Sequence, residues 1–454
     1  MSGERLWVVL AEELATRIFV QCGILEKLRS RVGDRLVVVD LLGEEQSERW
    51  RDAIGMPLVP WQELLPLQPS LQEKARRKID AWLDRRLGFF PLAIRFNERH
   101  GFHTDRMMRG HPNRILDTAL AGPLPRGARA ERAMTRWFFS TRRYVPSALE
   151  RRLEEDCRLL VLANLQARSC LPFLTAARRL GLPTVGYVAS WDHTVGKGVL
   201  SPYLERYLVQ NRAMANDLER YHGIGAERVV VTGWPQTDVF HRPRRRAEYD
   251  DLLRSYELDP ARPLVLVAGN TPTNAPYEDR LVERIVSWWR ATAADRVSLL
   301  FRPHPRDARW QERFAAARDE RGVHVQPASF TDMETLATLL QHADVVVANA
   351  GTILLDALVN DRPSVCVLYD EGAPPDEIWA EKNVLGEHYR ELMASGSFLV
   401  ASRFEELTDG IERSLAAPVE LAEARRRVSL EVVGSIDGRA SDRVVDAMLD
   451  GSFA

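Results

Sequence analysis

The stretch DMETLATLLQHADVVVANAGTILLDALVNDRPSVCVLYD, residues 332–370, indicates the fold most clearly. Its run VVVANA is apolar and rich in β-branched residues, which predicts a strand buried on both faces of a parallel sheet. This strand leads through Gly351 and Thr352 into the helical sequence ILLDALV, and a second apolar run, SVCVLYD, follows. The order strand, helix, strand predicts a βαβ unit of an α/β domain.

The same region carries polar groups that favour a bound phosphate. Gly351 and Thr352 begin the predicted helix, where backbone amides, the helix dipole and the threonine hydroxyl attract an anion. Carboxylates nearby can accept hydrogen bonds from sugar or polyol hydroxyls. The alternative is an ordinary Gly-Thr helix start without a ligand. The other candidate donor-binding residues of this region are Asn349, Asp356, Asp370 and Glu371.

Similar apolar runs recur along the chain in two series, and each series alternates with helical sequence. The polar stretch 241–263 carries arginines, prolines and some helical sequence, and we interpret it as a hinge. We therefore predict two doubly wound, Rossmann-like parallel-sheet domains, residues 1–240 and 241–454, facing a central cleft. The runs lie at 6–11, 35–42, 158–165, 184–190 and 228–233, and at 263–269, 297–303, 323–328, 345–350 and 364–370.

Composition excludes several classes of protein. The 454 residues are 45% hydrophobic and 28% charged, as in an ordinary globular chain. Lysine and arginine total 62 against 64 acidic residues, so no overall positive charge is available to hold a nucleic acid. The four cysteines form no C-x-x-C pair, which argues against a metal or disulfide framework. With no signal peptide or membrane span in the sequence, we expect a cytoplasmic protein.

Residues 66–155 interrupt the α/β alternation. From Lys74 to Arg114 the chain holds eleven basic and four acidic residues, with aromatic residues among them. This pattern predicts a basic helical insertion in the first domain. Such an insertion either seats an anionic acceptor, rests on an anionic membrane surface, or is a helical subdomain with a buried aromatic seam and solvated arginines.

The first domain holds the candidates for a general base. The segment TVGYVASWDHTVGKG, residues 184–198, leaves a predicted strand and places Asp192 beside His193. Glu12 follows the first strand and is a third candidate. The alternatives are a capped turn at 190–192 and an ordinary acidic helix start at Glu12. The candidate acceptor-binding residues are Arg17, Trp191 and Lys197.

Two strand ends of the second domain carry further candidates. In VLVAGNTPTNAPYE, residues 265–278, Asn270, Thr271 and Thr273 can hold phosphate oxygens, or can form a plain polar loop. FRPHP ends the next strand with Arg302 and with His304, whose backbone is restricted by the prolines on both sides. A His placed rigidly beside an Arg suits a phosphate or a departing diphosphate.

Together these motifs resemble the GT-B superfamily of nucleotide-sugar glycosyltransferases and the related CDP-glycerol glycerophosphotransferases of teichoic acid synthesis. The R-P-H-P element is similar to the His-Pro element that contacts donor phosphates in those enzymes, which gives this role to His304 with Arg302 nearby. N-A-G-T…D is similar to their helix start and acidic residue. It implies phosphate binding at Gly351 and Thr352 and a donor or structural contact at Asp356.

The element W-D-H-T-V-G-K resembles the W-H-G-T-x-x-K element of the glycerophosphotransferases, in which the His is the base. When the two are aligned on Trp191 and Lys197, Asp192 stands at the place of that His, and His193 at the place of the Gly. The base therefore stays open among Asp192, His193 and Glu12. The resemblance is strongest from about residue 158 to 372.

The resemblance implies a GT-B fold and a transferase. No D-x-D occurs in the sequence, consistent with metal-independent transfer without a cofactor. The leading hypothesis is an inverting glycosyltransferase that moves a sugar from a nucleotide-sugar donor to a glycan or lipid-linked acceptor in surface polysaccharide synthesis, at the inner face of the cell membrane. The open alternatives are CDP-glycerol-type polyol-phosphate transfer, nucleotide-sugar 2-epimerisation, and a non-catalytic nucleotide- or glycan-binding protein.

Overall fold

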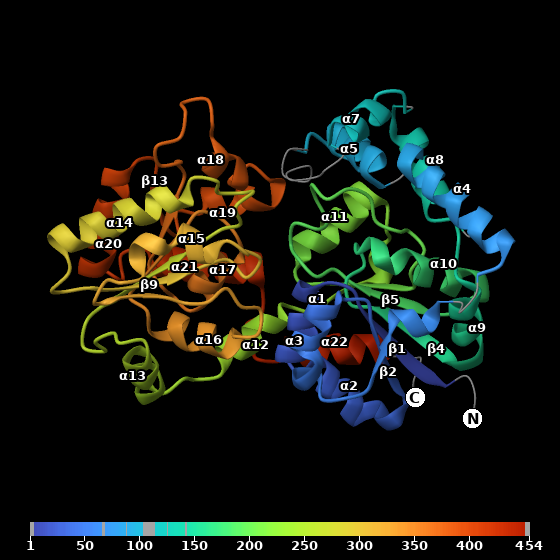
Figure 1. Ribbon diagram of the computed structural model, residues 1–454, viewed down its shortest axis with the longest axis horizontal. Coiled ribbons are helices and arrows are strands. Elements are labelled where there is room, and N and C mark those ends of the chain that lie inside the picture. The colour runs from blue at the N-terminus through green and yellow to red at the C-terminus, as the bar shows by residue number, and fades with distance from the viewer. Residues whose placement is uncertain are drawn as a thin grey trace. The chain divides into compact units, whose positions relative to one another are not determined.

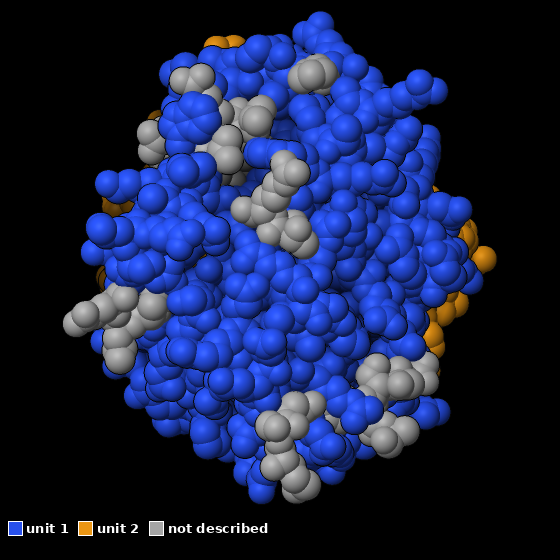
Figure 2. Space-filling model, turned by 90° about the vertical axis from the view of Figure 1, so that its right-hand side faces the viewer, with its two compact units in different colours: residues 1–235, 439–454 blue, residues 236–438 orange. Residues whose placement is uncertain are grey.

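The protein's structure, a computed structural model, describes residues 4–65, 69–87, 89–102, 114–124, 126–140 and 143–449. The chain forms two compact units, residues 1–235 with 439–454, and residues 236–438 (Figures 1 and 2). Each unit is built on one parallel sheet with helices. The two doubly wound α/β domains predicted from the sequence are confirmed.

The first unit contains a seven-stranded sheet in the order β3-β2-β1-β4-β5-β6-β7. Continuous apolar runs form its strands because both faces are covered, and Leu6 to Leu10 of β1 are fully buried. The chain runs outward from β1 to β3 and then returns to the other side of β1, so the order reverses between β1 and β4. The strands are β1 (Arg5–Leu10), β2 (Leu36–Asp40), β3 (Leu58–Pro60), β4 (Cys157–Leu162), β5 (Thr184–Tyr187), β6 (Arg206–Val209) and β7 (Val229–Val231).

The C-terminal helix α22 (Ala440–Leu449) belongs to the first unit, where it packs against α2 (Ile24–Val32). Lys27 and Arg31 of α2 form ion pairs with Asp442 and Asp446 of α22. The sequence prediction placed the boundary at 240 and kept all later residues in the second domain, whereas the structure divides the chain after residue 235 and returns residues 439–454 to the first unit.

Other helices of the first unit are α1 (Glu13–Gln21), α3 (Glu44–Ile54), α10 (Leu171–Leu180) and α11 (Arg212–His222).

The crossover from β3 to β4 contains the predicted insertion, which is helical. The side chains of Leu92, Ile94 and Phe96 on α5 are buried. Of the predicted basic stretch, residues 103–113 and the side chains of 83–90 and 114 lie outside the described residues. Among the described residues, no helix combines the length and the apolar character needed to cross a membrane. The helices are α4 (Leu71–Leu87), α5 (Phe89–His100), α7 (Arg114–Ala121), α8 (Ala128–Phe138) and α9 (Ser147–Asp156).

The second unit contains a six-stranded sheet in the order β10-β9-β8-β11-β12-β13. Its order reverses between β8 and β11, and ligands of doubly wound sheets bind at the carboxyl ends of strands at such a point. Here Ala268 at the end of β8 pairs with Arg302 of β9 on one side and with Ala348 of β11 on the other, so the three strands end level. The strands are β8 (Leu264–Ala268), β9 (Ser298–Arg302), β10 (Val323–Val325), β11 (Val345–Ala348), β12 (Ser364–Val367) and β13 (Leu399–Ala401).

Helices cover both sides of this sheet, and the stretch predicted as a hinge lies inside the unit. Its helix α13 (Arg246–Ser255) packs on α16 through Tyr249 and His342. The buried indole of Trp289 on α14 donates its N–H to the carbonyl of Val297 at 2.8 Å, which satisfies its polar atom within the core. Other helices are α12 (Pro235–His241), α14 (Glu278–Thr292), α15 (Trp310–Arg313), α16 (Met333–His342), α17 (Thr352–Val359), α18 (Trp379–Val384), α19 (Arg390–Ala394), α20 (Phe404–Ala416) and α21 (Ala422–Val428).

Candidate active site

In the second unit, the sequence-predicted donor residues lie in the loops that leave four adjacent strands. Because β9, β8, β11 and β12 are neighbours and parallel, these loops emerge at one edge of the sheet. Asn270 after β8 and Asn349 after β11 lie within 3.4 Å of each other through their side-chain amides. The sheet therefore brings together two residues that are 79 positions apart in sequence.

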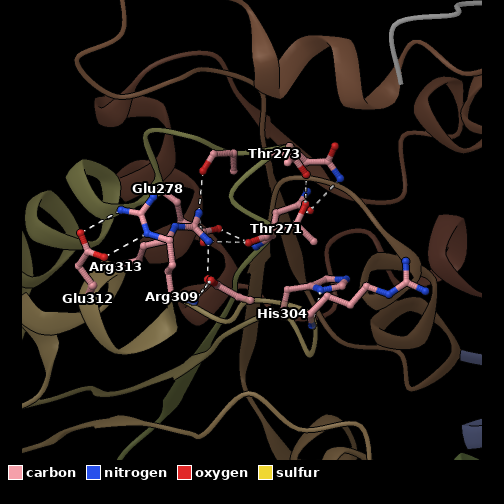
Figure 3. Close-up of polar contacts among 12 residues, drawn as sticks. Thr271, Thr273, Glu278, His304, Arg309, Glu312 and Arg313 are labelled. Carbon is pink, nitrogen blue, oxygen red and sulfur yellow. Dashed lines mark hydrogen bonds and ion pairs between the residues drawn. The ribbon is translucent and has the colours of Figure 1, made fainter. Parts of the chain in front are cut away.

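The loop after β8 is folded by Asn270, and this exposes two threonine hydroxyls. The backbone N–H of Asn270 donates to Glu278 Oε1 at 2.7 Å, and its Oδ1 accepts the N–H of Thr271 at 2.8 Å. The hydroxyls of Thr271 and Thr273 lie 3.1 Å apart at the surface of the loop (Figure 3). Asn270 thus shapes the loop, while the threonines present hydroxyls suited to an anion.

A buried arginine that sequence reasoning missed supports this loop. The Arg313 guanidinium donates to the carbonyl of Asn270 at 2.9 Å and pairs with Glu278 at 2.8 Å and with buried Asp307 (Figure 3). Burial raises the pKa of Glu278 to about 7. Asp307 lies in the loop after β9 that also carries His304, so one guanidinium joins the two loops. No local sequence pattern marks this role.

The imidazole of His304 has a fixed tautomer. Its Nδ1 accepts the backbone N–H of Arg306 at 3.0 Å, and its carbonyl accepts the N–H of Asp307 at 2.8 Å. Because Nδ1 is an acceptor, the ring proton lies on Nε2. The side chain is partly exposed at the end of β9. Thus His304 can present a neutral N–H donor from a rigid turn.

Arg302, predicted to contact the donor, is buried and engaged inside the protein. Its guanidinium pairs with both carboxylate oxygens of Asp332, at 2.6 and 2.9 Å, and donates to Gln326 Oε1 at 2.9 Å. A bidentate pair of this kind fixes the geometry at the end of β9. The structure thus places Arg302 in an internal network at the end of β9, and direct contact with the donor stays a prediction.

At the start of α17, Gly351 has φ 112°, a conformation that favours glycine. Its backbone N–H donates to the hydroxyl of buried Tyr389 at 2.6 Å. A phosphate can therefore bind this amide only if it displaces the Tyr389 hydroxyl. The amide of Thr352, one residue further into the helix, is the next candidate. Asp356 is buried within α17 and accepts the side-chain amide of Gln236 at 2.6 Å.

A pocket of about 530 Å³, partly open to solvent, lies beside these loops. Asn349 braces it by donating to the carbonyls of Val367 at 2.7 Å and Ala380 at 3.0 Å. Asp370 accepts the N–H of Ala380 at 2.9 Å, and Glu371 pairs with Arg284 at 2.6 Å. The sequence analysis did not name its three aromatic residues, Tyr277, Phe314 and Tyr369, and the available signal for Tyr277 was its place just before the acidic start of α14. The lining includes Val267, Ala268, Tyr277, Glu278, Val347, Asn349, Tyr369, Asp370 and Glu371.

In the first unit, Glu12 lies where the strand order reverses, between β1 and β4. Its carboxylate accepts the side-chain amide of Asn164 at 2.9 Å. Asn164 in turn accepts the N–H of Gln166, whose side chain donates to the carbonyl of His193 at 2.6 Å. A continuous hydrogen-bonded path therefore links the loops after β1, β4 and β5. Asn164 lies at the end of the predicted run 158–165 and Gln166 follows it directly, so the pattern used for the other loops indicates them too.

The loop after β5 holds the other base candidates. The buried Asp192 carboxylate accepts the Ser190 hydroxyl at 2.5 Å and lies 3.6 Å from the Lys197 ammonium. The backbone N–H of His193 donates to the carbonyl of Ser190 at 3.0 Å. These hydrogen bonds form a turn like the capped turn at 190–192 that the sequence analysis left as an alternative. The same turn also carries the candidate bases Asp192 and His193.

The predicted acceptor residues differ in their surroundings. Trp191 is buried, with its ring centroid 6.2 Å from that of Trp234, so the side chain packs within the unit. Arg17 lies on α1 and is half-buried, and Lys197 lies beside Asp192. Arg17 therefore lies on a helix, and Trp191 and Lys197 lie in the loop after β5. Contact with the acceptor stays a prediction for each of them.

The chain was compared with known proteins. None of the curated proteins matches it. Solved structures with a similar fold include UDP-GlcNAc 2-epimerase from Neisseria meningitidis bound to UDP-GlcNAc (TM-score 0.55, 12% identity, covering 98% of this chain and 100% of that one). S. aureus MnaA in complex with UDP gives a TM-score of 0.54 at 10% identity, covering 98% and 96%. A glycosyltransferase from Rickettsia africae gives 0.50 at 8% identity, covering 99% and 100%.

At such low identity these structures are evidence for the fold alone, and they confirm the GT-B architecture. The family model for CDP-glycerol:poly(glycerophosphate) glycerophosphotransferases matches residues 197–450. That range includes the whole second unit, with the loops of Asn270, His304 and Gly351. It begins at Lys197, the last residue of the W-D-H-T-V-G-K element. On this match, which spans more than half of the sequence, the chain belongs to the CDP-glycerol:poly(glycerophosphate) glycerophosphotransferase family.

Proposed function

We propose that this protein transfers a polyol phosphate from a CDP-activated donor, of which CDP-glycerol is the type, to a hydroxyl of a cell-envelope polymer. The acceptor is a glycan or lipid-linked chain, and neither a cofactor nor a metal ion takes part. Family membership supports the choice of donor class. It shifts the emphasis from sugar transfer, the leading hypothesis from sequence, to the polyol-phosphate alternative.

One observation in the second unit carries this proposal. His304 holds its proton on Nε2 because Nδ1 accepts the Arg306 N–H at 3.0 Å. A neutral N–H donor at a strand end, next to threonine hydroxyls and a helix N-terminus, stabilises the negative charge that grows on a departing phosphate. Because the hydrogen bonds of the turn hold the ring in place beforehand, little reorganisation is needed during the reaction.

The proposed reaction is a displacement at the phosphorus that carries the polyol. The acceptor hydroxyl loses its proton to a base, its oxygen forms a bond to this phosphorus, and the bond to the bridging oxygen breaks. CMP leaves, with its new charge facing His304 and the start of α17. We assign the base to His193, since imidazole is suited to proton transfer near neutral pH.

A variant series separates the three base candidates. His193→Ala should abolish transfer while donor affinity is kept, whereas Asp192→Asn and Glu12→Gln should each leave measurable transfer. If His193→Ala retains turnover and Asp192→Asn loses it, the base is Asp192, as its alignment with the family's His suggests. Donor affinity, measured by thermal shift, shows whether each variant still binds.

Sugar transfer from a nucleoside diphosphate donor is the second candidate function. It is favoured by the departure at Asp192 and His193 from the family's W-H-G-T element, and by the start of the family match only at Lys197. The two functions differ in the nucleotide that leaves. Transfer of a polyol phosphate releases CMP, whereas transfer of a sugar releases a nucleoside diphosphate.

A donor panel tests the proposal. The purified protein is incubated with CDP-glycerol or with nucleotide sugars that carry uridine or guanosine, each with a poly(glycerol phosphate) primer and EDTA. Release of CMP from CDP-glycerol, unaffected by EDTA, is the expected result. Release of UDP or GDP without CMP would instead favour the second candidate, and conversion of a donor sugar to its epimer without a second substrate would identify an epimerase.

A further inference from the structure

A second polar pocket lies wholly within the first unit, where the helical insertion meets the rest of the unit. Its volume is about 730 Å³, partly open to solvent. The insertion contributes side chains from α5 and α8, and the opposite wall comes from α11 and residues 199–202. The lining residues that matter for binding are Arg99, Glu131, Arg132, Arg136, Arg220 and His222.

The pocket has a net positive charge, because four arginines line it against two carboxylates, those of Glu131 and Glu219. Arg99 pairs with Glu131 at 3.2 Å. Within the part of the chain that the structure describes, Arg132, Arg136 and Arg220 form no ion pair, and all three are exposed. Arginines line the pocket from both walls, so a ligand inside it meets guanidinium groups on two sides. This arrangement suits an anion with several oxygens, because a guanidinium matches the geometry of phosphate.

Glu131 adds a hydrogen-bond acceptor to the same pocket. Its side chain is only 7% exposed, and one carboxylate oxygen pairs with Arg99. The other oxygen, Oε2, is buried and has no hydrogen-bond partner among the described residues. Such an oxygen is costly to leave unsatisfied, so it favours a ligand that brings a donor. Burial raises the pKa of Glu131 to about 7.

The floor of the pocket touches the loop that holds the base candidates. His222 stacks on Phe96 with ring centroids 4.9 Å apart, and its Nδ1 accepts the N–H of Leu200 at 3.3 Å. Its Nε2 therefore donates to the carbonyl of Thr194 at 2.9 Å. Asn97 of α5 donates to the carbonyl of Gly196 at 3.2 Å. A ligand in this pocket thus lies against elements that hold residues 192–197.

We propose that this pocket binds a polyol-phosphate segment of the acceptor polymer, with Arg132, Arg136 and Arg220 on phosphate oxygens and the free oxygen of Glu131 accepting a polyol hydroxyl. The inference rests on the proposed function for the identity of the polymer. It deepens that function by assigning an acceptor subsite, separate from the donor loops of the second unit. An anion without a hydroxyl, such as sulfate, satisfies the arginines but leaves Glu131 unsatisfied, so the pocket prefers a polyol phosphate to sulfate.

Binding is tested by calorimetric titration of the full chain without any donor, using a poly(glycerol phosphate) oligomer, glycerol phosphate and sulfate as probes. The double variant Arg136→Ala, Arg220→Ala should bind the oligomer at least about tenfold more weakly than the wild type, given the strength of charge-assisted hydrogen bonds. The control is Arg129→Ala, Arg212→Ala, which removes two exposed arginines from the same helices outside the lining and should change affinity less than about twofold.

Glu131→Gln tests the hydroxyl contact. It should reduce the preference for glycerol phosphate over sulfate, because the glutamine side chain is a neutral and therefore weaker hydrogen-bond acceptor. Equal loss in the arginine double variant and its control, or an unchanged preference in Glu131→Gln, overturns the proposal.

Two further results keep this inference distinct from the proposed function. If the protein releases CMP from CDP-glycerol but its affinity for the oligomer is unchanged in the arginine double variant, the subsite is refuted and the proposed function is kept. Arginine-dependent oligomer binding without turnover of any donor refutes the transferase proposal but supports the subsite. Binding to anionic phospholipid vesicles that depends on these arginines, with no oligomer binding, identifies a membrane contact and also overturns the subsite.

Discussion

The donor loops of the second unit and the basic pocket of the first unit are both rich in arginine, but they use it in opposite ways. In the donor loops, Arg302 is held by Asp332 and Arg313 by Asp307 and Glu278. In the pocket, Arg132, Arg136 and Arg220 have no carboxylate partner among the described residues. In the donor loops, the arginines stabilise the structure that holds neutral donors such as His304. In the pocket, the arginines are available to bind an anion.

Arg313→Ala should have the largest effect on the scaffold. It leaves the carboxylates of Asp307 and Glu278 buried without their partner, and such a loss costs about 3–5 kcal/mol. Denaturant unfolding measures the change. The control is Arg309→Ala, in the same loop as Asp307, whose ion pair with Glu312 at 2.9 Å is exposed and should contribute little to stability (Figure 3). Equal losses in both variants would contradict the scaffold role.

His304→Asn should have the next largest effect. The asparagine Oδ1 can still accept the Arg306 N–H, so the turn is kept, but the Nε2–H donor is lost. We expect kcat to fall by about 10²–10³-fold, as for removal of a single donor to a developing anion, with little change in unfolding free energy. His241→Asn, on the exposed end of α12, is the matched control and should keep full activity. A variant His304→Asn with wild-type kcat contradicts the role in phosphate stabilisation.

A pH series on Glu131→Gln tests the pocket. The folded-state pKa of Glu131 is raised to about 7 from an ordinary 4.5, so the folded protein holds this proton more tightly than the unfolded chain. The wild type should therefore lose stability as pH rises from about 4.5 through about 7, by up to about 3 kcal/mol. Glutamine does not titrate, so the variant should lack this loss. Parallel pH profiles of unfolding free energy for the two proteins would argue that Glu131 is not buried as described.

Tyr389→Phe should have the smallest effect. It removes the hydroxyl that accepts the Gly351 N–H at 2.6 Å and should lower the unfolding free energy by about 1 kcal/mol. If the donor phosphate uses this amide, the variant should bind the nucleotide as well as the wild type or a few times more tightly. Weaker nucleotide binding would mean that Tyr389 supports the site in another way.

Much of the fold could be predicted because burial on both faces of a parallel sheet demands continuous apolar runs, and these are visible in the sequence. The missed strands β3, β6 and β13 span only three or four residues, and none of them carries a run of β-branched residues like that of the equally short β7. The C-terminal helix returns to the first unit through packing and ion pairs with α2, and chain order gives no sign of this.

The candidate site divides in the same way. Residues at strand ends, such as His304 and Thr271, could be predicted because parallel strands deliver their loops to one edge. Their partners could not, since Tyr389 lies 38 residues from Gly351 and Arg313 lies 43 residues from Asn270, and only the tertiary fold brings them together. Sequence marks where chemistry can occur, whereas the internal ion pairs decide which polar groups are left for a ligand.

The most direct test follows the phosphorus. The protein is incubated with CDP-glycerol and a poly(glycerol phosphate) primer, and the polymer product is analysed by ³¹P NMR while CMP is quantified. Our account predicts new phosphodiester signal in the polymer, equal in amount to the CMP released and lost in His304→Asn. Incorporation of a sugar from a nucleotide-sugar donor, with no phosphorus added to the polymer and a nucleoside diphosphate released, would contradict it.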